Sequence, residues 1–209
     1  MKIIIIKFYK YKIGKATRKT LKRELFLVIN MHKNKFATRL NSFKSNWHSS
    51  QKPTVRDLIE RASRVKGLTH VDLNFPDHSE PSLIDIAKIT KDSGLSINGL
   101  AMRYYTNPSF KLGAFTNPNK KVRQEAIDLT KKAIDGLREI NSNLLTIWLG
   151  QDGFDYGFQV DYKKIWNDEI QAIKEIAEYD KDCLISIEYK PNEPRAYSLL
   201  SNLGTTLLA

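Results

Sequence analysis

The chain has 209 residues, of which 41% are hydrophobic and 10% aromatic, so its composition is that of a globular domain and excludes a disordered polypeptide. Its single cysteine, Cys183, excludes a framework of internal disulfides and fits a reducing compartment. No apolar run reaches the roughly 18 residues of a membrane span, and no signal-peptide pattern is present. We therefore expect a cytoplasmic protein without membrane contact.

The formal net charge of +11 suggests nucleic-acid binding, but the charge is unevenly distributed. Residues 1–30 hold nine Lys or Arg and one acidic residue, Glu24, so the remainder is close to neutral. We expect residues 1–32 to form a basic N-terminal extension outside the fold and residues 33–209 to form one incomplete domain. The extension carries no nucleic-acid-binding motif, so we do not expect a nucleic-acid partner.

Short apolar segments, typical of buried strands, alternate along the chain with longer segments that have apolar residues at helical spacing. Thr54 and Asp57 have the spacing of a capping box, and Gly67 is placed to end the helix that they begin. We expect strands at 36–43, 69–75, 95–104, 144–150 and 183–189, helices at 54–66, 81–92, 121–140, 162–179 and from Pro194 to the end, and a long loop at 105–119.

Strands that alternate with helices pair in parallel through right-handed crossovers. In the fifth strand, Ile185 and Ile187 share an apolar face, whereas Ser186, Glu188 and Lys190 share a face that is polar toward the carboxyl end. A doubly wound sheet would bury both faces, whereas a barrel keeps functional groups at the carboxyl ends of its strands. The sequence therefore predicts an α/β fold, a partial (β/α)8 TIM barrel of about five βα units.

Glu188 and Lys190 lie two apart at the end of one strand, so both side chains face the mouth of the predicted barrel. A buried carboxylate needs a cation or strong donors. One interpretation places a divalent metal on Glu188 and lets Lys190 act on substrate oxygens. The alternative is an ion pair between the two side chains at the rim.

Three other residues also have interpretations: Trp148 and Asp152 each have a structural and a functional one, and Cys183 has a structural one. Trp148 faces the same mouth from the fourth strand, where it either packs in the core or forms a flat wall for a sugar. Asp152 is either a turn residue or a substrate contact. Cys183 falls on the apolar face as a buried thiol, and the four histidines lack metal-ligand spacing.

Five stretches are more specific than this pattern: KFATRLNSFKS (35–45), GLTHVDLNFPDH (67–78), GLSINGLAMRYYTNPSFKLGAFTNP (94–118), TIWLGQDGFDY (146–156) and ISIEYKPNEPRAYSLL (185–200). Within them, the segments WLGQDG and EYKPNEPR are the most specific. On these stretches, residues 33–209 resemble bacterial sugar isomerases of the xylose-isomerase-like TIM-barrel superfamily, and in particular its L-rhamnose-isomerase-like members.

The resemblance implies a metal-dependent aldose–ketose sugar isomerase. It makes Glu188 the first ligand of a divalent metal, often Mn²⁺, and Lys190 a catalytic residue at the reacting oxygens. Trp148 becomes a substrate-binding residue that lines the pocket. From its position in the loop at 150–154, rather than from the resemblance, we also expect Asp152 to contact the substrate. In such enzymes the metal stabilises charge on the sugar oxygens while hydrogen moves between C1 and C2.

The chain departs from the family in one respect: the remaining metal ligands come from strands six to eight, and only five strands are predicted here. One carboxylate cannot hold a catalytic Mn²⁺. We therefore expect an inactive, truncated chain or one half of a split barrel. Its open edges predict poor solubility unless a separately encoded C-terminal half or a second copy covers them.

Other functions on the same barrel stay open. A sugar epimerase or dehydratase would use the same fold, and a non-catalytic remnant would use none of its chemistry. An abasic-site endonuclease needs a His-rich multi-zinc site, which the scattered histidines do not favour.

Overall fold

A computed structural model describes residues 35–45 and 52–209 of the chain. The chain divides into two units, Met1–Phe36 and Ala37–Ala209, and the fold is that of the second. The predicted basic extension, residues 1–32, lies outside the described residues. No helix in the described part of the chain is long and apolar enough to cross a membrane.

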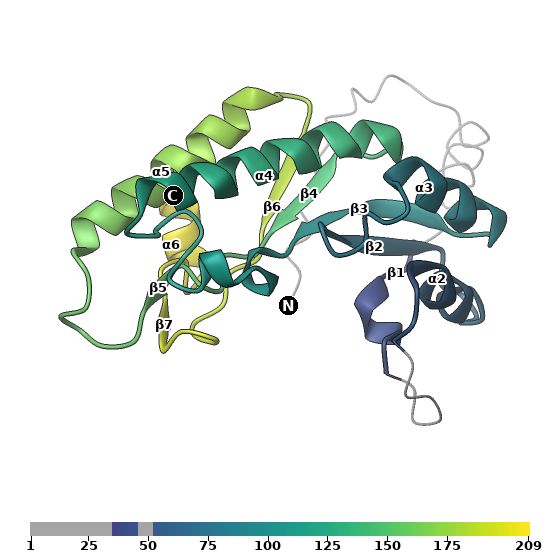
Figure 1. The fold of residues 1–209 in the computed structure, drawn as a ribbon, viewed down its shortest axis with the longest axis horizontal. Helices are drawn as coiled ribbons and strands as arrows, with labels where there is room; N and C mark the ends of the chain where they lie inside the picture. The colour runs from purple at the N-terminus through teal and green to yellow at the C-terminus, as the bar shows by residue number, and fades with distance from the viewer. Residues whose placement is uncertain (1–34, 46–51) are drawn as a thin grey trace, which may run out of the picture. The chain divides into compact units, whose positions relative to one another are not determined.

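Five parallel strands form the main sheet in the order β1-β2-β3-β4-β6, so each new strand is added on the same side of its predecessor (Figure 1). This order is that of successive right-handed βα units in a barrel. It confirms the predicted α/β fold with about five βα units. The strands are β1 (Ala37–Arg39), β2 (His70–Phe75), β3 (Ser96–Met102), β4 (Leu144–Ile147) and β6 (Leu184–Ile187).

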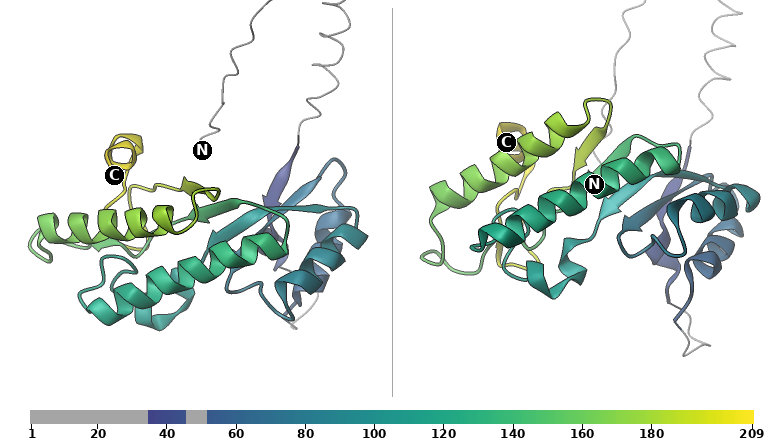
Figure 2. Two further views of the ribbon diagram at one scale, coloured as in Figure 1. Left: turned by 90° about the horizontal axis from the view of Figure 1, so that it is seen from above. Right: turned by 45° about the horizontal axis from the view of Figure 1, so that its top comes forward.

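The long helices lie along one side of this sheet, and α4 and α5 run next to each other there (Figure 2). Their bounds are α2 (Val55–Ser63), α3 (Leu83–Asp92), α4 (Lys120–Glu139) and α5 (Tyr162–Tyr179). Each begins at a residue whose side chain accepts a backbone N–H of the first turn. At α2 the predicted capping box is present, because Thr54 and Asp57 each accept the other's backbone N–H.

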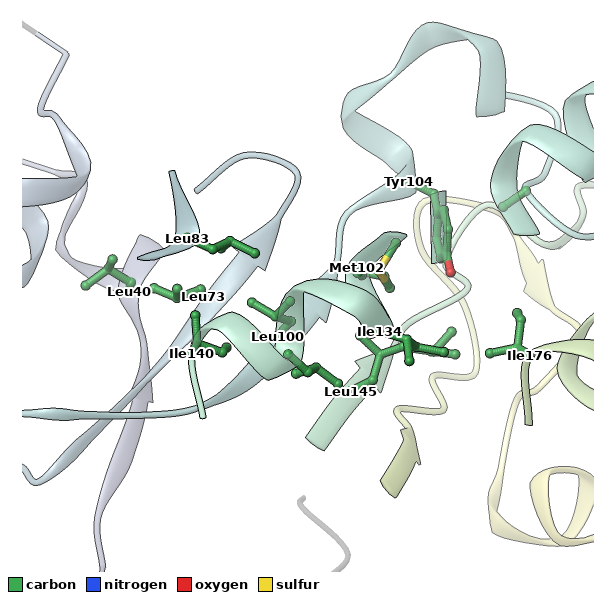
Figure 3. Close-up of a cluster of buried hydrophobic side chains, with 14 of the residues drawn as sticks. Leu40, Leu73, Leu83, Leu100, Met102, Tyr104, Ile134, Ile140, Leu145 and Ile176 are labelled. Carbon is green, nitrogen blue, oxygen red and sulfur yellow. The ribbon is translucent and has the colours of Figure 1, made fainter. Parts of the chain in front are cut away.

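The core lies between the helices and the apolar side of the sheet (Figure 3). Parallel register places Leu73 beside Leu100 and Leu100 beside Leu145, and all three are buried. Ile134 of α4 and Ile176 of α5 bury their side chains in the same cluster. Burial of this continuous apolar layer is the main stabilising contribution of the fold.

The other side of the sheet, which we call the inner face, carries the alternate side chains. Parallel register aligns them from strand to strand, because Arg39 lies beside Asp72, Ala101 beside Thr146, and Thr146 beside Ser186. The predicted division of β4 and β6 into an apolar and a more polar side is therefore present. In a closed barrel, this side of the sheet faces the interior.

The structure differs from the prediction at the first strand, around the loop at 105–119 and after Pro194. The first strand is short and continues as the 3-10 helix η1 (Leu40–Phe43), and the predicted loop at 105–119 contains two more, η2 (Tyr104–Thr106) and η3 (Pro108–Phe110). The helix predicted from Pro194 is wrong. There β7 (Tyr197–Ser198) pairs antiparallel with β5 (Gly153–Phe154), and only α6 (Leu203–Leu208) is helical.

The cause of the last difference is tertiary. Arg195 binds Asp155 at 3.2 Å, and the backbone N–H of Ala196 donates to the same carboxylate at 3.1 Å, which holds the segment extended. Gly153 permits the close approach, because a Cβ there would lie 2.0 Å from the carbonyl oxygen of Tyr197. These contacts outweigh the local preference of a proline for the first turn of a helix.

Candidate functional site at the carboxyl rim

The structure brings Trp148, Glu188 and Lys190 together at the carboxyl ends of β4 and β6. The backbone N–H of Glu188 donates to the carbonyl of Ile147 at 2.9 Å, which extends the pairing of the two strands by one residue. A small hollow opens there and is lined by Trp148, Leu149, Ile187, Glu188, Lys190, Ser198 and Leu200. The hollow has no room for a whole sugar, so it forms at most one wall of such a site.

Two aromatic rings, those of Trp148 and Tyr105, pack together at this rim. The ammonium group of Lys190 lies 5.7 Å from the centre of the Trp148 ring, within the range of a cation–π contact. Tyr105 packs edge-on against the same indole with ring centres 5.1 Å apart. The guanidinium of Arg103 in turn lies 4.2 Å from the centre of the Tyr105 ring. The indole is thus fixed between a cation and a second ring.

Glu188 is half exposed and forms an ion pair with Arg39 of β1. The alternative interpretation, an ion pair between Glu188 and Lys190, is wrong, because Lys190 binds Glu193 three residues further along the loop. The physical reason is the curvature of the sheet, which brings the rim of its first strand to the rim of its last.

Arg103 and Asp77 extend the charged rim on the side of β2 and β3. Their closest atoms, Nε of Arg103 and Oδ2 of Asp77, are 3.7 Å apart, and both side chains are mostly buried. Burial lowers the pKa of Arg103, and the neighbouring Arg39 lowers it further, whereas Asp77 and Glu188 act in the opposite direction. Arg39, Arg103 and Glu188 therefore share one electrostatic environment.

His78 and Asn74 lie buried at the end of β2, and both carry polar atoms without partners. The backbone N–H of Asn74 donates to Nδ1 of His78 at 3.1 Å. Burial, followed by the charge of Lys44, lowers the pKa of His78 to about 4, so the ring is neutral and its proton sits on Nε2. That N–H and both polar atoms of the Asn74 amide have no partner.

Asp152 does not line the hollow, and its side chain is buried. Its carboxylate accepts the backbone N–H groups of Ala114 and Thr116 at 3.1 and 2.7 Å and the Thr116 hydroxyl at 2.8 Å. Burial raises the pKa of Asp152, although these hydrogen bonds oppose the shift. The arrangement anchors the loop before α4 and gives no support to the predicted substrate contact.

A second buried acid, Glu169 of α5, faces the same region. Neither of its carboxylate oxygens has a hydrogen-bond partner, and its side chain has no exposed surface. Burial raises the pKa of Glu169 well above its ordinary value, and the charge of Asp152 raises it further. A protonated Glu169 removes the repulsion between the two acids.

The sequence prediction missed Arg39, Asn74, His78 and Arg103 as rim residues. The alternation in β2 held a signal, because Asp72 and Asn74 place two polar side chains on one face of a buried strand. No comparable local signal marks Arg39, which lies in a strand of three residues.

The described residues do not fit a catalytic divalent metal on their own. In residues 35–45 and 52–209 there is no group of three or more His, Cys, Asp or Glu side chains that could hold a metal ion. Glu188 supplies one carboxylate, and Arg39 already neutralises it. A catalytic metal needs more ligands than this.

No protein-family model matches the chain. Over 124 residues it is 27% identical to a curated xylose isomerase from Thermus thermophilus, a match that covers 57% of this chain and 32% of that enzyme. Solved structures are similar over a larger part of the chain. A D-psicose 3-epimerase from Clostridium cellulolyticum H10, solved with D-tagatose, matches with a TM-score of 0.57 and 13% identity over 79% of this chain and 55% of that one.

Two further solved structures share this fold. An L-ribulose 3-epimerase matches with a TM-score of 0.61 and 16% identity over 83% of this chain and 55% of that chain. A xylose isomerase domain protein from Alicyclobacillus acidocaldarius matches with a TM-score of 0.54 and 11% identity over 83% of this chain and 57% of that chain. The chain spans a little more than half of these structures and about a third of the curated relative.

The fold and its polar carboxyl rim define a part of a parallel β/α barrel. More particularly, the chain has the fold of the xylose-isomerase-like TIM-barrel family of sugar isomerases and epimerases, and it covers part of that barrel. The resemblance identified in the sequence is therefore confirmed at the level of the family fold.

Proposed function

We propose that this chain forms one wall of a sugar-binding site in an aldose–ketose isomerase, with Trp148, Lys190 and Glu188 as the residues that meet the sugar. The observation that carries the proposal is their convergence on one hollow at the carboxyl ends of β4 and β6. Functional groups of β/α barrels lie at this end of the strands.

Each of the three side chains has a distinct task in this proposal. The indole of Trp148, held by Tyr105, offers a flat apolar surface to the C–H face of a sugar. Lys190 lies above that ring and donates to sugar oxygens, where a positive charge stabilises developing negative charge. Glu188 accepts hydrogen bonds from sugar hydroxyls.

Turnover requires more than this wall. The divalent metal implied by the resemblance, Mn²⁺, would polarise the sugar oxygens when bound, but the described residues supply only Glu188 toward it. We therefore propose that residues 33–209 are an incomplete catalytic domain. Its activity depends on further strands, from a C-terminal half or a second copy, and the chain alone does not isomerise sugars.

Epimerisation is the second candidate. It is favoured because solved structures with this fold include 3-epimerases of D-psicose and L-ribulose. The wall formed by Trp148 and Lys190 suits either reaction, since both work on the carbon atoms next to a sugar carbonyl. The two functions differ in their products: an isomerase converts a ketose into an aldose, and an epimerase into another ketose.

Saturation-transfer NMR with D-xylose, L-rhamnose and D-fructose tests sugar binding by the chain. We expect transfer to sugar C–H protons that is lost in Trp148→Ala and weakened in Lys190→Gln. Phe158→Ala is the matched control, because Phe158 is fully exposed and lies outside the hollow. Equal transfer in Trp148→Ala and the unaltered chain would refute the wall. Conversion of any of these sugars by the chain alone with Mn²⁺ would refute its incompleteness.

A further inference from the structure

The ion pair between Arg39 and Glu188 joins the two edges of the five-strand sheet. Arg39 is the last residue of β1, and Glu188 directly follows β6, so the pair links the first and last strands in the sheet order. Their side chains meet only if the inner face is concave at its carboxyl rim. The guanidinium therefore reaches Glu188 from across the mouth of the incomplete barrel.

Arg39 is also the more buried partner of the pair. Its side chain is 23% exposed, whereas that of Glu188 is 52% exposed. A guanidinium in a partly buried position needs an acceptor, and it matches a carboxylate in shape and charge. The other nearby cations have their own partners, since Lys190 binds Glu193 and Arg103 lies beside Asp77.

We propose that Arg39 is a built-in cation for Glu188 and occupies on this carboxylate the position that a divalent metal would take. Glu188 then stays oriented toward the hollow without metal. This inference rests on the geometry of the pair, and it shares with the proposed function only the assignment of Glu188 to the sugar wall. A chain that does not bind sugar would therefore not contradict this inference about Arg39.

The proposal predicts that Mn²⁺ has no preference for Glu188 while Arg39 is present. The test is a Mn²⁺ titration of the full chain, followed by paramagnetic broadening of assigned backbone amide signals. Glu60 is the internal reference, because it pairs with Arg64 in an ion pair on the exposed surface of α2. We expect the Glu188 signal to broaden at no lower Mn²⁺ concentration than the Glu60 signal.

Substitution of the arginine separates the built-in cation from other causes. In Arg39→Gln, Glu188 should broaden at a several-fold lower Mn²⁺ concentration, whereas Arg39→Lys, which keeps the charge, should behave as the unaltered chain. Arg64→Gln is the matched control and should leave the response of Glu188 unchanged. Early broadening of Glu188 with Arg39 present, or no gain in Arg39→Gln, would overturn the proposal.

A second measurement decides the question if Arg39→Gln fails to fold. Thermal melting of the unaltered chain and of Glu188→Gln is compared with EDTA and with Mn²⁺. We expect Mn²⁺ to shift both melting temperatures equally, because it does not bind Glu188 in the native protein. A Mn²⁺-dependent rise that is present in the unaltered chain and absent in Glu188→Gln would show that Glu188 holds metal despite Arg39.

Discussion

Replacing Asp152 by alanine should strongly destabilise the domain, and the effect should not depend on any bound ligand. The substitution removes the acceptor of two buried backbone N–H groups, those of Ala114 and Thr116, and of the Thr116 hydroxyl. Each buried donor left without a partner costs about 1–3 kcal/mol. Burial also raises the pKa of the Asp152 carboxylate, so the cost of burying its charge offsets part of the stabilisation that its hydrogen bonds provide.

The net loss that we expect for Asp152→Ala is about 3 kcal/mol in the free energy of unfolding. For a domain of this size such a loss lowers the melting temperature by roughly 6–12 °C. Asp152→Asn keeps one acceptor oxygen and should lose about half as much. Urea unfolding followed by circular dichroism measures the free energies, and thermal melts measure the temperatures.

A matched control for this prediction is Asp92→Ala. Asp92 is exposed at the end of α3, and a surface substitution there should change the free energy of unfolding by no more than about 0.5 kcal/mol. If Asp152→Ala changes the free energy of unfolding by no more than this control, the carboxylate does not anchor the loop before α4. Its role would then have to be sought in binding.

Three further predictions concern a buried acid, the buried histidine and the rim. In the folded chain Glu169 keeps a proton that it releases in the unfolded chain above its ordinary pKa of 4.5. The free energy of unfolding should therefore fall as the pH rises from 4.5 toward the folded pKa, and the urea midpoints of Glu169→Gln should not show this fall. His78 has a pKa of about 4 in the folded chain and 6.5 in the unfolded chain. The free energy of unfolding should therefore decrease as the pH falls from 6.5 to 4, by at most about 3 kcal/mol. An acid titration of His78→Gln that shows the same decrease would contradict this role of His78. Tyr105→Ala removes the ring that packs against Trp148. It should weaken saturation transfer to sugars and change the free energy of unfolding by only about 1 kcal/mol. Unchanged saturation transfer would show that the indole does not need the Tyr105 ring.

Elements with a strong period could be predicted from the sequence. The bounds of α5 agree at both ends with the predicted helix, 162–179, because Asp161 caps its start and apolar residues continue at helical spacing. Alternation along β4 and β6 also predicted that Trp148, Glu188 and Lys190 lie near one another, and one hollow is lined by all three. These properties depend on neighbours within one or two turns or strand positions, which the local sequence contains.

Partners that are distant in sequence could not be predicted. Arg39 and Glu188 are 149 positions apart, and their contact depends on how strongly the whole sheet curves. Asp152 binds a loop 36 to 38 positions away, so its turn-like sequence context concealed an anchoring role. The pair of β5 and β7 is likewise supported by contacts between distant segments, among them the ion pair of Asp155 and Arg195.

The most direct test of the sugar wall uses the indole N–H signals of the three tryptophans, Trp47, Trp148 and Trp166, in a ¹H–¹⁵N NMR spectrum during titration with D-xylose or L-rhamnose. Trp148→Phe assigns its signal by loss of one peak. We predict a saturable shift of the Trp148 signal, while the signal of Trp166, which packs against the core, stays in place. A Trp148 signal that does not move at saturating concentrations of either sugar would contradict the account.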